Sequence, residues 1–272
     1  MGWAVAWSLQ SCAADPLVKH VLTHSAPPIT QATADTAPNN VMFPRTLRSF
    51  VRRQGRTTLG QTRALAEIGP KVLISYTGVP TDVPRLFDQP ANPLILEIGF
   101  GMGEATAQIA MTLPGTNFLC CEVHEPGVGA LLKRIGENSI GNIRILAHDA
   151  VEALDSMLAP NSLDGVHIFF PDPWHKKRHN KRRLIQGPLV AKLAARIKPG
   201  GYLHCATDWE PYAIQMLEVL GAEPLLSNSV QSENATNQAY AAKPAYRPLT
   251  KFENRGLKLG HGVWDLVFLR RS

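Results

Sequence analysis

The stretch Leu94–Glu104, LILEIGFGMGE, decides the fold of this 272-residue chain. Residues 94–98 are apolar except for Glu97, as in a short parallel strand that is buried on both faces. Three glycines follow in the pattern G-x-G-x-G, and a helical pattern then covers residues 104–113. Because glycine has no Cβ, such a turn brings the backbone close to a ligand. The stretch therefore predicts a nucleotide pocket at the start of an α/β unit.

The spacing of Gly99, Gly101 and Gly103 indicates which nucleotide is bound. A dinucleotide fingerprint, G-x-G-x-x-G, makes room for a pyrophosphate, and this turn does not match it. Glu97 stands two residues before the first glycine, where an acid repels phosphate and suits a cation. The pattern resembles motif I of the class I S-adenosylmethionine (SAM) methyltransferases. A tight turn in another α/β domain is the alternative.

Four acids close four successive predicted strands at intervals of 25, 27 and 23 residues, namely Glu97, Glu122, Asp149 and Asp172. The carboxyl ends of parallel strands line one edge of a doubly wound sheet, and ligands bind there. Glu122 is placed to accept hydrogen bonds from a ribose, and Asp149 to lie on the adenine side. Each acid alone could instead be a helix N-cap. We expect strands at residues 94–98, 117–123, 142–147, 163–170, 201–206 and 263–269, and a helix from Leu184 to Ile197.

The composition is that of a globular chain, with 44% hydrophobic and 18% charged residues and no apolar run of transmembrane length. Its four cysteines show no C-x-x-C spacing, which favours reduced thiols over disulfides or zinc. Basic residues concentrate in two patches of net charge +6, within residues 41–77 and 175–183, although the whole chain also carries only +6. Two such patches on an otherwise acidic chain indicate a polyanionic partner, of which RNA and DNA are the usual ones.

The chain divides by composition into three parts. Residues 1–41 lack periodicity and become rich in Pro, Thr, Ala and Asn, so we expect a disordered extension, with Met42 as an alternative start. Residues 42–90 carry the first basic patch and are expected to form an arm that contacts RNA. Residues 91–272 are expected to form the α/β domain.

The fourth predicted strand leads into Pro171-Asp172-Pro173-Trp174, and the second basic patch follows at once. A carboxylate, a large aromatic ring and a run of cations within twelve residues suggest a nucleobase site with a grip on the phosphate backbone. Trp174 could instead be a core aromatic. His175 and His179 have the spacing of a metal pair, but no third ligand is near in sequence, so we expect no metal.

These motifs resemble the bacterial tRNA (guanine-N7-)-methyltransferase family. The resemblance runs from about Arg45 to the end and rests on SFVRRQGR, E-x-G-x-G-x-G-E, CEVHEPG, HDA, FFPDPWHKKRHNKRR, TDWE, TKFENRG and GHGVWDL. It implies a Rossmann-like class I methyltransferase fold, with a doubly wound, mostly parallel seven-stranded sheet whose last strand is antiparallel. It also implies methyl transfer from SAM to N7 of guanine at position 46 in the variable loop of tRNA.

The resemblance assigns roles to individual residues. The implied SAM contacts are Glu97, Gly99, Gly101, Gly103, Glu122, Asp149 and Asp172, and Asp172 is also the implied catalytic residue. The implied substrate contacts are Lys176, Asp208, Thr250, Lys251, Phe252 and Glu253. The implied RNA contacts are Arg178, His179, Asn180, Lys181, Arg182 and Arg183. Residues 1–40 contain none of the motifs that carry the resemblance.

Two other functions remain open on the residues alone. The chain could be a SAM enzyme for another RNA position or for a small molecule, although two basic patches disfavour a small molecule. It could also be a nucleic-acid-binding protein on a degenerate scaffold, although the intact glycines and acids argue against that. We expect a cytoplasmic protein, a monomer or a homodimer, that binds SAM and tRNA and neither a membrane nor a metal.

Overall fold

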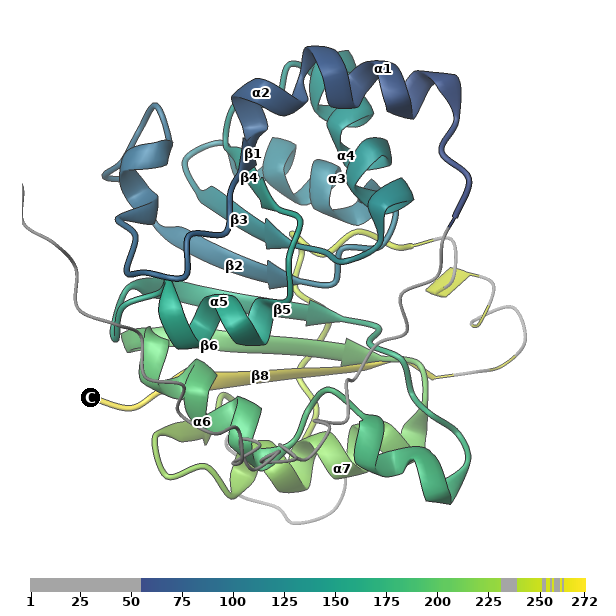
Figure 1. The fold of residues 1–272 in the computed structure, drawn as a ribbon. Coiled ribbons are helices and arrows are strands. Elements are labelled where there is room, and N and C mark those ends of the chain that lie inside the picture. Colours follow the sequence, from purple (N-terminus) through teal and green to yellow (C-terminus); the bar gives the residue numbers. More distant parts are fainter. Residues whose placement is uncertain (1–54, 231–238, 251–252, 255, 257–259, 261) are drawn as a thin grey trace, which may run out of the picture. The chain divides into compact units, whose positions relative to one another are not determined.

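A computed structural model gives the arrangement of the chain and describes residues 55–230, 239–250, 253–254, 256, 260 and 262–272. Its centre is one eight-stranded sheet in the order β1-β4-β3-β2-β5-β6-β8-β7 (Figure 1). The strands are β1 (Leu73–Ile74), β2 (Leu94–Ile98), β3 (Asn117–Cys121), β4 (Ile143–Leu146), β5 (Leu163–Phe169), β6 (Ile197–Thr207), β7 (Leu226–Asn228) and β8 (Trp264–Arg270).

Among the described strands, β8 runs opposite to the rest of the sheet and pairs antiparallel with β6 and with β7. The other pairs described, from β1 to β6, are parallel. The doubly wound sheet with an antiparallel last strand is therefore confirmed, and with it the Rossmann-like class I fold. None of the helices in the described ranges is long and apolar enough to cross a membrane.

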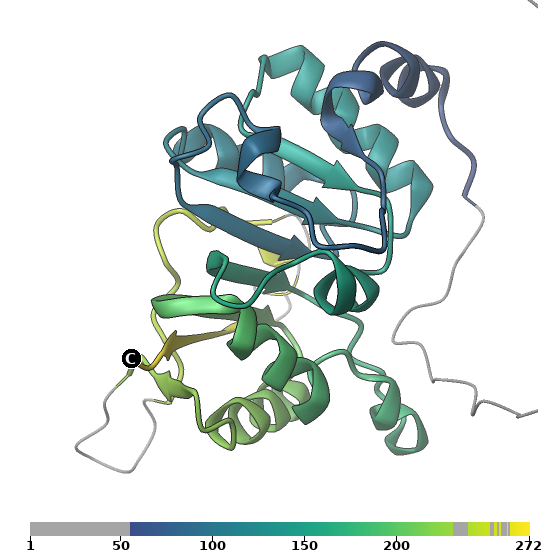
Figure 2. The same ribbon diagram turned by 60° about the vertical axis from the view of Figure 1, so that its left-hand side comes forward.

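Helices cover both faces of the sheet (Figures 1 and 2). Along β2, Leu94, Leu96 and Ile98 pack on one face, whereas Ile95 packs on the other. The first face carries α5 (Ala150–Ser156), α6 (Gly187–Arg196) and α7 (Glu210–Gly221). The second carries α1 (Leu59–Glu67), α3 (Glu104–Thr112) and α4 (Glu125–Asn138). The remaining short elements are α2 (Gly69–Val72) and the 3₁₀-helices η1 (Val83–Leu86) and η2 (Lys177–Arg182).

Two details differ from the sequence-based expectation. The sheet has eight strands and not seven, and one of them, β1, comes from the segment expected to be an RNA-binding arm. The helix expected at residues 184–197 covers only Gly187–Arg196, because Ile197 already pairs with Leu163 at the start of β6. Gly200, with φ of 82°, lies in the irregular part of β6 between Ile197, which pairs with Leu163, and Tyr202, which pairs with Gly165.

The order of the strands places the functional site. The chain leaves β2 toward β3 and β4 on one side, and β5 and β6 lie on the other. At such a reversal the loops that follow the strands separate, and a crevice opens beyond their carboxyl ends. The loops after β2, β3, β4 and β5 therefore meet at one edge of the sheet.

Candidate active site

The glycine loop after β2 is open toward the edge of the sheet. Gly99, Gly101 and Gly103 have φ of 78°, 56° and 69°, in the left-handed region that disfavours other residues. A Cβ placed on Gly99 or Gly101 would meet nothing within 4 Å, whereas one on Gly103 would lie 2.7 Å from the Cβ of Leu131. The first two glycines therefore leave free space beside the backbone, and the third lets α3 pack against α4.

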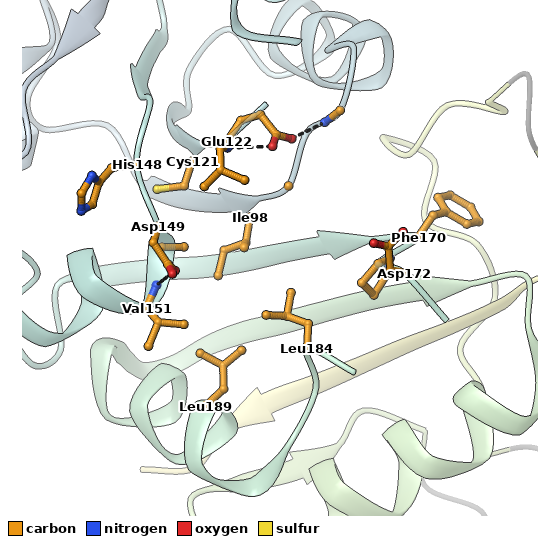
Figure 3. Close-up of a pocket in the computed structure, with 15 residues that line it drawn as sticks. Ile98, Cys121, Glu122, His148, Asp149, Val151, Phe170, Asp172, Leu184 and Leu189 are labelled. Carbon is orange, nitrogen blue, oxygen red and sulfur yellow. Dashed lines mark hydrogen bonds between the residues drawn. The ribbon is translucent and has the colours of Figure 1, made fainter. Parts of the chain in front are cut away.

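A cavity of about 220 Å³ lies at this edge, between the loops that follow β2, β3, β4 and β5 (Figure 3). Three of the four predicted acids line it: Glu122, Asp149 and Asp172. Glu122 and Asp149 lie on one side of the cavity and Asp172 on the other (Figure 3). The apolar part of the lining includes Ile98, Val151, Phe170, Leu184 and Leu189. The site combines an apolar wall with carboxylates, as a nucleoside that carries a cation requires.

Glu122 and Asp149 both hold backbone N–H groups. One oxygen of Glu122 accepts from the N–H of Gly101 at 2.9 Å, and the other accepts from Val123 at 2.7 Å and from His124 at 2.9 Å. Asp149 is the N-cap of α5 and accepts from the N–H of Val151 at 2.9 Å. Each carboxylate thus fixes a loop of the cavity and still faces the cavity itself.

Glu97 does not line the cavity but lies on the other face of β2, where only 4% of its surface is exposed. It accepts hydrogen bonds from the Thr106 hydroxyl at 3.0 Å and from the Cys120 thiol at 3.8 Å. Burial raises the pKa of the Glu97 carboxyl to about 7. The structure therefore separates Glu97 from the three acids with which the sequence spacing grouped it.

The loop that carries Asp172 is strained at both ends. Phe170 and Trp174 have φ of 51° and 46°, although each has a bulky side chain. A residue held in this region costs on the order of 1–3 kcal/mol. Asp172 itself is exposed and reaches the cavity (Figure 3). The chain thus holds a carboxylate at the cavity on a backbone that needs support from its surroundings.

The second basic patch follows this loop, and its cations differ in how far they are exposed to solvent. Lys176, Arg178 and Lys181 are exposed, and Lys176 precedes η2, which includes the other two. The guanidinium of Arg182 stacks over the ring of Trp174 at 4.1 Å, and only 4% of Arg183 is exposed. His179 and Asn180 are partly buried. The cations therefore divide into an exposed group, Arg182, which is partly buried and stacks on Trp174, and Arg183, which is buried.

Glu253, and through it Thr250, is held by a buried network of charges around Arg247 that includes Asp265 of β8 and His204 of β6. Arg247 donates two hydrogen bonds to Glu253, at 2.8 and 3.0 Å, and two to Asp265, both at 2.7 Å. His204 shares Asp265 at 2.7 Å, and burial lowers the pKa of this histidine. The N–H of Glu253 donates to the Thr250 hydroxyl at 3.1 Å.

Other predicted substrate residues are placed by the neighbouring elements. Asp208, which is partly buried, directly follows β6 and lies two residues before α7. Lys251 and Phe252 lie outside the described residues, as do the extension at 1–41 and Arg45, Arg48, Arg52 and Arg53 of the first basic patch. Within the part of the chain that is described, no group of three or more His, Cys, Asp and Glu side chains is arranged to hold a metal ion.

Known proteins resemble the chain over this whole site. A family profile described as "Putative methyltransferase" matches residues 91–266. A tRNA (guanine-N(7)-)-methyltransferase of Acidovorax sp. (strain JS42) is 68% identical over 91% of this chain and 95% of its own length. Relatives with the same description from Polaromonas naphthalenivorans (strain CJ2) and Polaromonas sp. (strain JS666) are 65% and 70% identical, over 92% and 84% of this chain and 100% and 91% of their own length. The chain belongs to the tRNA (guanine-N(7)-)-methyltransferase family.

Sequence reasoning missed several residues that shape the site in this member of the tRNA (guanine-N(7)-)-methyltransferase family. Leu184 and Leu189 both line the cavity. They follow the second basic patch in the sequence, and neither belongs to a recognised motif. Tyr76 stacks at 3.9 Å on His148, which is itself part of the lining. Gly127 did have a signal, since it ends the CEVHEPG motif, and it packs against the glycine loop. Arg247 lies three residues before TKFE, and no motif in the sequence points to it.

Proposed function

We propose that this chain transfers a methyl group from SAM to N7 of guanine at position 46 in the variable loop of tRNA. The observation that carries the proposal is the Asp172 loop, which joins the cavity at the strand ends directly to an exposed run of cations. The names of the relatives support the same activity. We further propose that the enzyme works in the cytoplasm, where tRNA is held.

The residues of the cavity fit SAM. Free space beside Gly99 and Gly101 is a cradle that any Cβ would fill, and Glu122 and Asp149 are carboxylates suited to ribose hydroxyls and to the adenine side. SAM, when bound, supplies an electrophilic methyl group on a positively charged sulfonium. Gly103 has a structural role, because its lack of a Cβ lets the start of α3 pack against Leu131 of α4. Glu97 stands behind the loop, where its bonds to Thr106 and Cys120 tie β2 to α3 and β3.

Guanine N7 already carries a free lone pair, so the reaction requires no base to remove a proton. The chain must instead orient the guanine and exclude misaligned approaches, and positioning of this kind is a large source of rate. The methylated base is a cation. We assign to Asp172 the role of holding the guanine and favouring the positive charge as it develops. Asp208 and Thr250, with Lys251 and Phe252, complete the proposed substrate contacts. Glu253, of which only 3% is exposed, is proposed to act by holding Thr250.

The exposed cations of the second basic patch are proposed to hold the tRNA phosphates. Lys176, Arg178 and Lys181 are exposed, and Arg182, which is partly buried and stacks on Trp174, is a proposed RNA contact beside them. His179 and Asn180 are proposed contacts beside them. Phosphate contacts release counterions, so tRNA affinity should fall steeply as the salt concentration rises.

Methyl transfer from labelled SAM to two matched tRNA transcripts tests the proposal. One transcript carries guanine at position 46 and the other carries 7-deazaguanine there. Label that enters only the first transcript supports the proposal. Label that enters both places the target elsewhere, and label that enters neither, with SAM still bound, contradicts methyl transfer to tRNA.

Asp172→Ala tests the assignment within the site, with Asp82→Ala as a matched control on an exposed carboxylate that pairs with Arg85. Loss of a preorganised electrostatic contact lowers kcat by about 10²–10³-fold. We expect that loss for Asp172→Ala and none for the control. Wild-type turnover by Asp172→Ala would refute the role of Asp172.

A further inference from the structure

Arg183 lies at the end of the basic patch but faces inward. Only 4% of it is exposed, whereas Lys176, Lys177, Arg178 and Lys181 are all exposed. The backbone turns at this position, because η2 ends at Arg182 and Arg183 caps it with φ of −56° and ψ of 138°. A guanidinium buried to this extent is not placed to meet a phosphate on the surface of the protein.

The contacts of Arg183 join the Asp172 loop to α7. Its Nε donates to the carbonyl of Pro173 at 2.8 Å. A terminal nitrogen donates to the side chain of Gln215 at 2.6 Å and to the carbonyl of Pro211 at 3.3 Å. The guanidinium also lies over the ring of Tyr212, 4.8 Å from its centroid. One planar group thus holds three points on two segments, which a lysine could not do.

The partners of Arg183 are themselves fixed. Gln215 donates to the carbonyl of Ile185 at 3.2 Å, and the N–H of Ile185 donates to the hydroxyl of Tyr212 at 3.0 Å. Ile185 and Tyr212 are fully buried in the core. The anchor to which Arg183 ties the loop is therefore part of the rigid scaffold.

The carbonyl that Arg183 holds is the one before the strained residue. Pro173 precedes Trp174, whose φ of 46° no ordinary side chain prefers. Asp172 precedes Pro173 and lines the cavity, and Asp208 lies three residues before Pro211. Arg183 therefore fixes the distance between the segment that carries Asp172 and the segment that carries Asp208.

We propose that Arg183 is a positioning residue that holds the Asp172 loop against α7, and that it does not contact the tRNA phosphates. The inference rests on the proposed function and deepens it. Of the six cations of residues 176–183, five are then assigned to RNA binding, and Arg183 is assigned to positioning the carboxylate of Asp172. Because Arg183 acts through Asp172, its loss should change turnover more than tRNA affinity.

The test compares Arg183→Lys and Arg183→Gln with Arg178→Gln, a matched loss of an exposed cation from the same run. For each variant, kcat, KM for tRNA and the slope of log affinity against log salt concentration are measured. A shift of about 1 Å at a reacting group costs up to about 100-fold in rate. We expect both Arg183 variants to lose about 10- to 100-fold in kcat with the wild-type salt slope. Arg178→Gln should reduce that slope by about 0.7 to 0.9.

Either of two kinetic results with the Arg183 variants would overturn the inference. Wild-type kcat in Arg183→Lys would show that a positive charge alone is sufficient at this position. A salt slope reduced in Arg183→Gln as much as in Arg178→Gln would show that Arg183 contacts phosphate. If the Arg183 variants fail to fold, Gln215→Leu removes one partner and leaves the arginine. We expect it to lower kcat with an unchanged salt slope, and wild-type kcat would contradict the role.

SAM affinity, measured by calorimetry without tRNA, separates this inference from the proposed function. Asp172 and Phe170 line the cavity, so a displaced loop should weaken SAM binding several-fold in Arg183→Lys. A wild-type chain that binds SAM and methylates no tRNA would contradict the proposed function alone. Unchanged SAM affinity in Arg183→Lys would then contradict the positioning role.

Discussion

Gly127, the third residue of α4, packs against the glycine loop with no room for a side chain. A Cβ added there would lie 2.1 Å from the carbonyl oxygen of Gly101 and 3.1 Å from its carbonyl carbon. Real Cβ atoms essentially never come closer than 3.0 Å to another heavy atom, so Gly127→Ala requires a movement of about 0.9 Å. Because the obstacle is backbone and not the end of a flexible side chain, either α4 or the loop must move.

The loss of SAM affinity in Gly127→Ala depends on whether the glycine loop or α4 moves. Overpacking of this kind costs about 1–3 kcal/mol. The loop is the softer of the two partners, since α4 is buried at Val128, Leu131 and Leu132, whereas the loop is held by single hydrogen bonds such as Gly101 N–H to Glu122 at 2.9 Å. If the loop takes up the strain, the Kd for SAM rises about 5- to 150-fold.

Calorimetric titration of SAM into Gly127→Ala measures this loss directly, and a thermal scan of the same sample reports any loss of stability. Gly115→Ala is the matched control, because a Cβ there would meet nothing within 4 Å. We expect the control to bind SAM as the wild type does. Wild-type affinity in Gly127→Ala would refute the argument, and a lower Tm with unchanged affinity would show that α4 takes up the strain.

Two further predictions concern buried charge. Burial raises the pKa of Glu97 from 4.5 to about 7, so the folded state favours the neutral carboxyl. The free energy of unfolding is therefore highest below pH 4.5, where the carboxyl is neutral in both states, and it decreases as the pH rises to 7. Urea unfolding of the SAM-free chain should therefore show Glu97→Gln more stable than the wild type at pH 8, by roughly 3 kcal/mol, with the difference gone at pH 4.5; equal pH profiles would contradict this. Arg247→Gln leaves Glu253 and Asp265 buried without their cation and should cost about 3–5 kcal/mol in the same assay. The exposed control Arg63→Gln should leave the midpoint unchanged, and a midpoint for Arg247→Gln equal to that of the control would refute the prediction.

The pattern of apolar residues predicted the parallel strands well, because a strand buried on both faces is a continuous apolar run. The segment at 94–98 matches β2 residue for residue. The two short strands β1 and β7 have two and three residues, too few for a period to be visible. Their place in the sheet depends on their partners in β4 and β8 and not on their own sequence.

The acids show where spacing stops being informative. Regular intervals grouped Glu97 with Glu122, Asp149 and Asp172, but successive side chains of a strand point to opposite faces. Glu97 precedes Ile98, which faces the cavity, and so it lies behind β2. The other three come after the last residue of their strands, in loops free to turn toward the cavity.

The basic patch shows the same limit for charge. Six cations within eight residues indicate an anion-binding surface, and nothing in the run marks Arg183 as different. Its burial is decided by Pro211 and Gln215, which are 28 and 32 residues away in sequence. Partners at that separation become visible only when α7 is in place.

The pairing of β1 with β4 sets a practical limit on how far the chain can be shortened. The family profile begins at residue 91, but a chain cut there would lose β1 and expose the N–H and C=O groups along one side of β4. It would also uncover the apolar surface beneath Ala64 and Val72 of the preceding helices. An unpaired, apolar strand at the border of a sheet is a template for joining further chains. The smallest chain that remains soluble should therefore begin before α1, some thirty residues upstream of the start of the family profile.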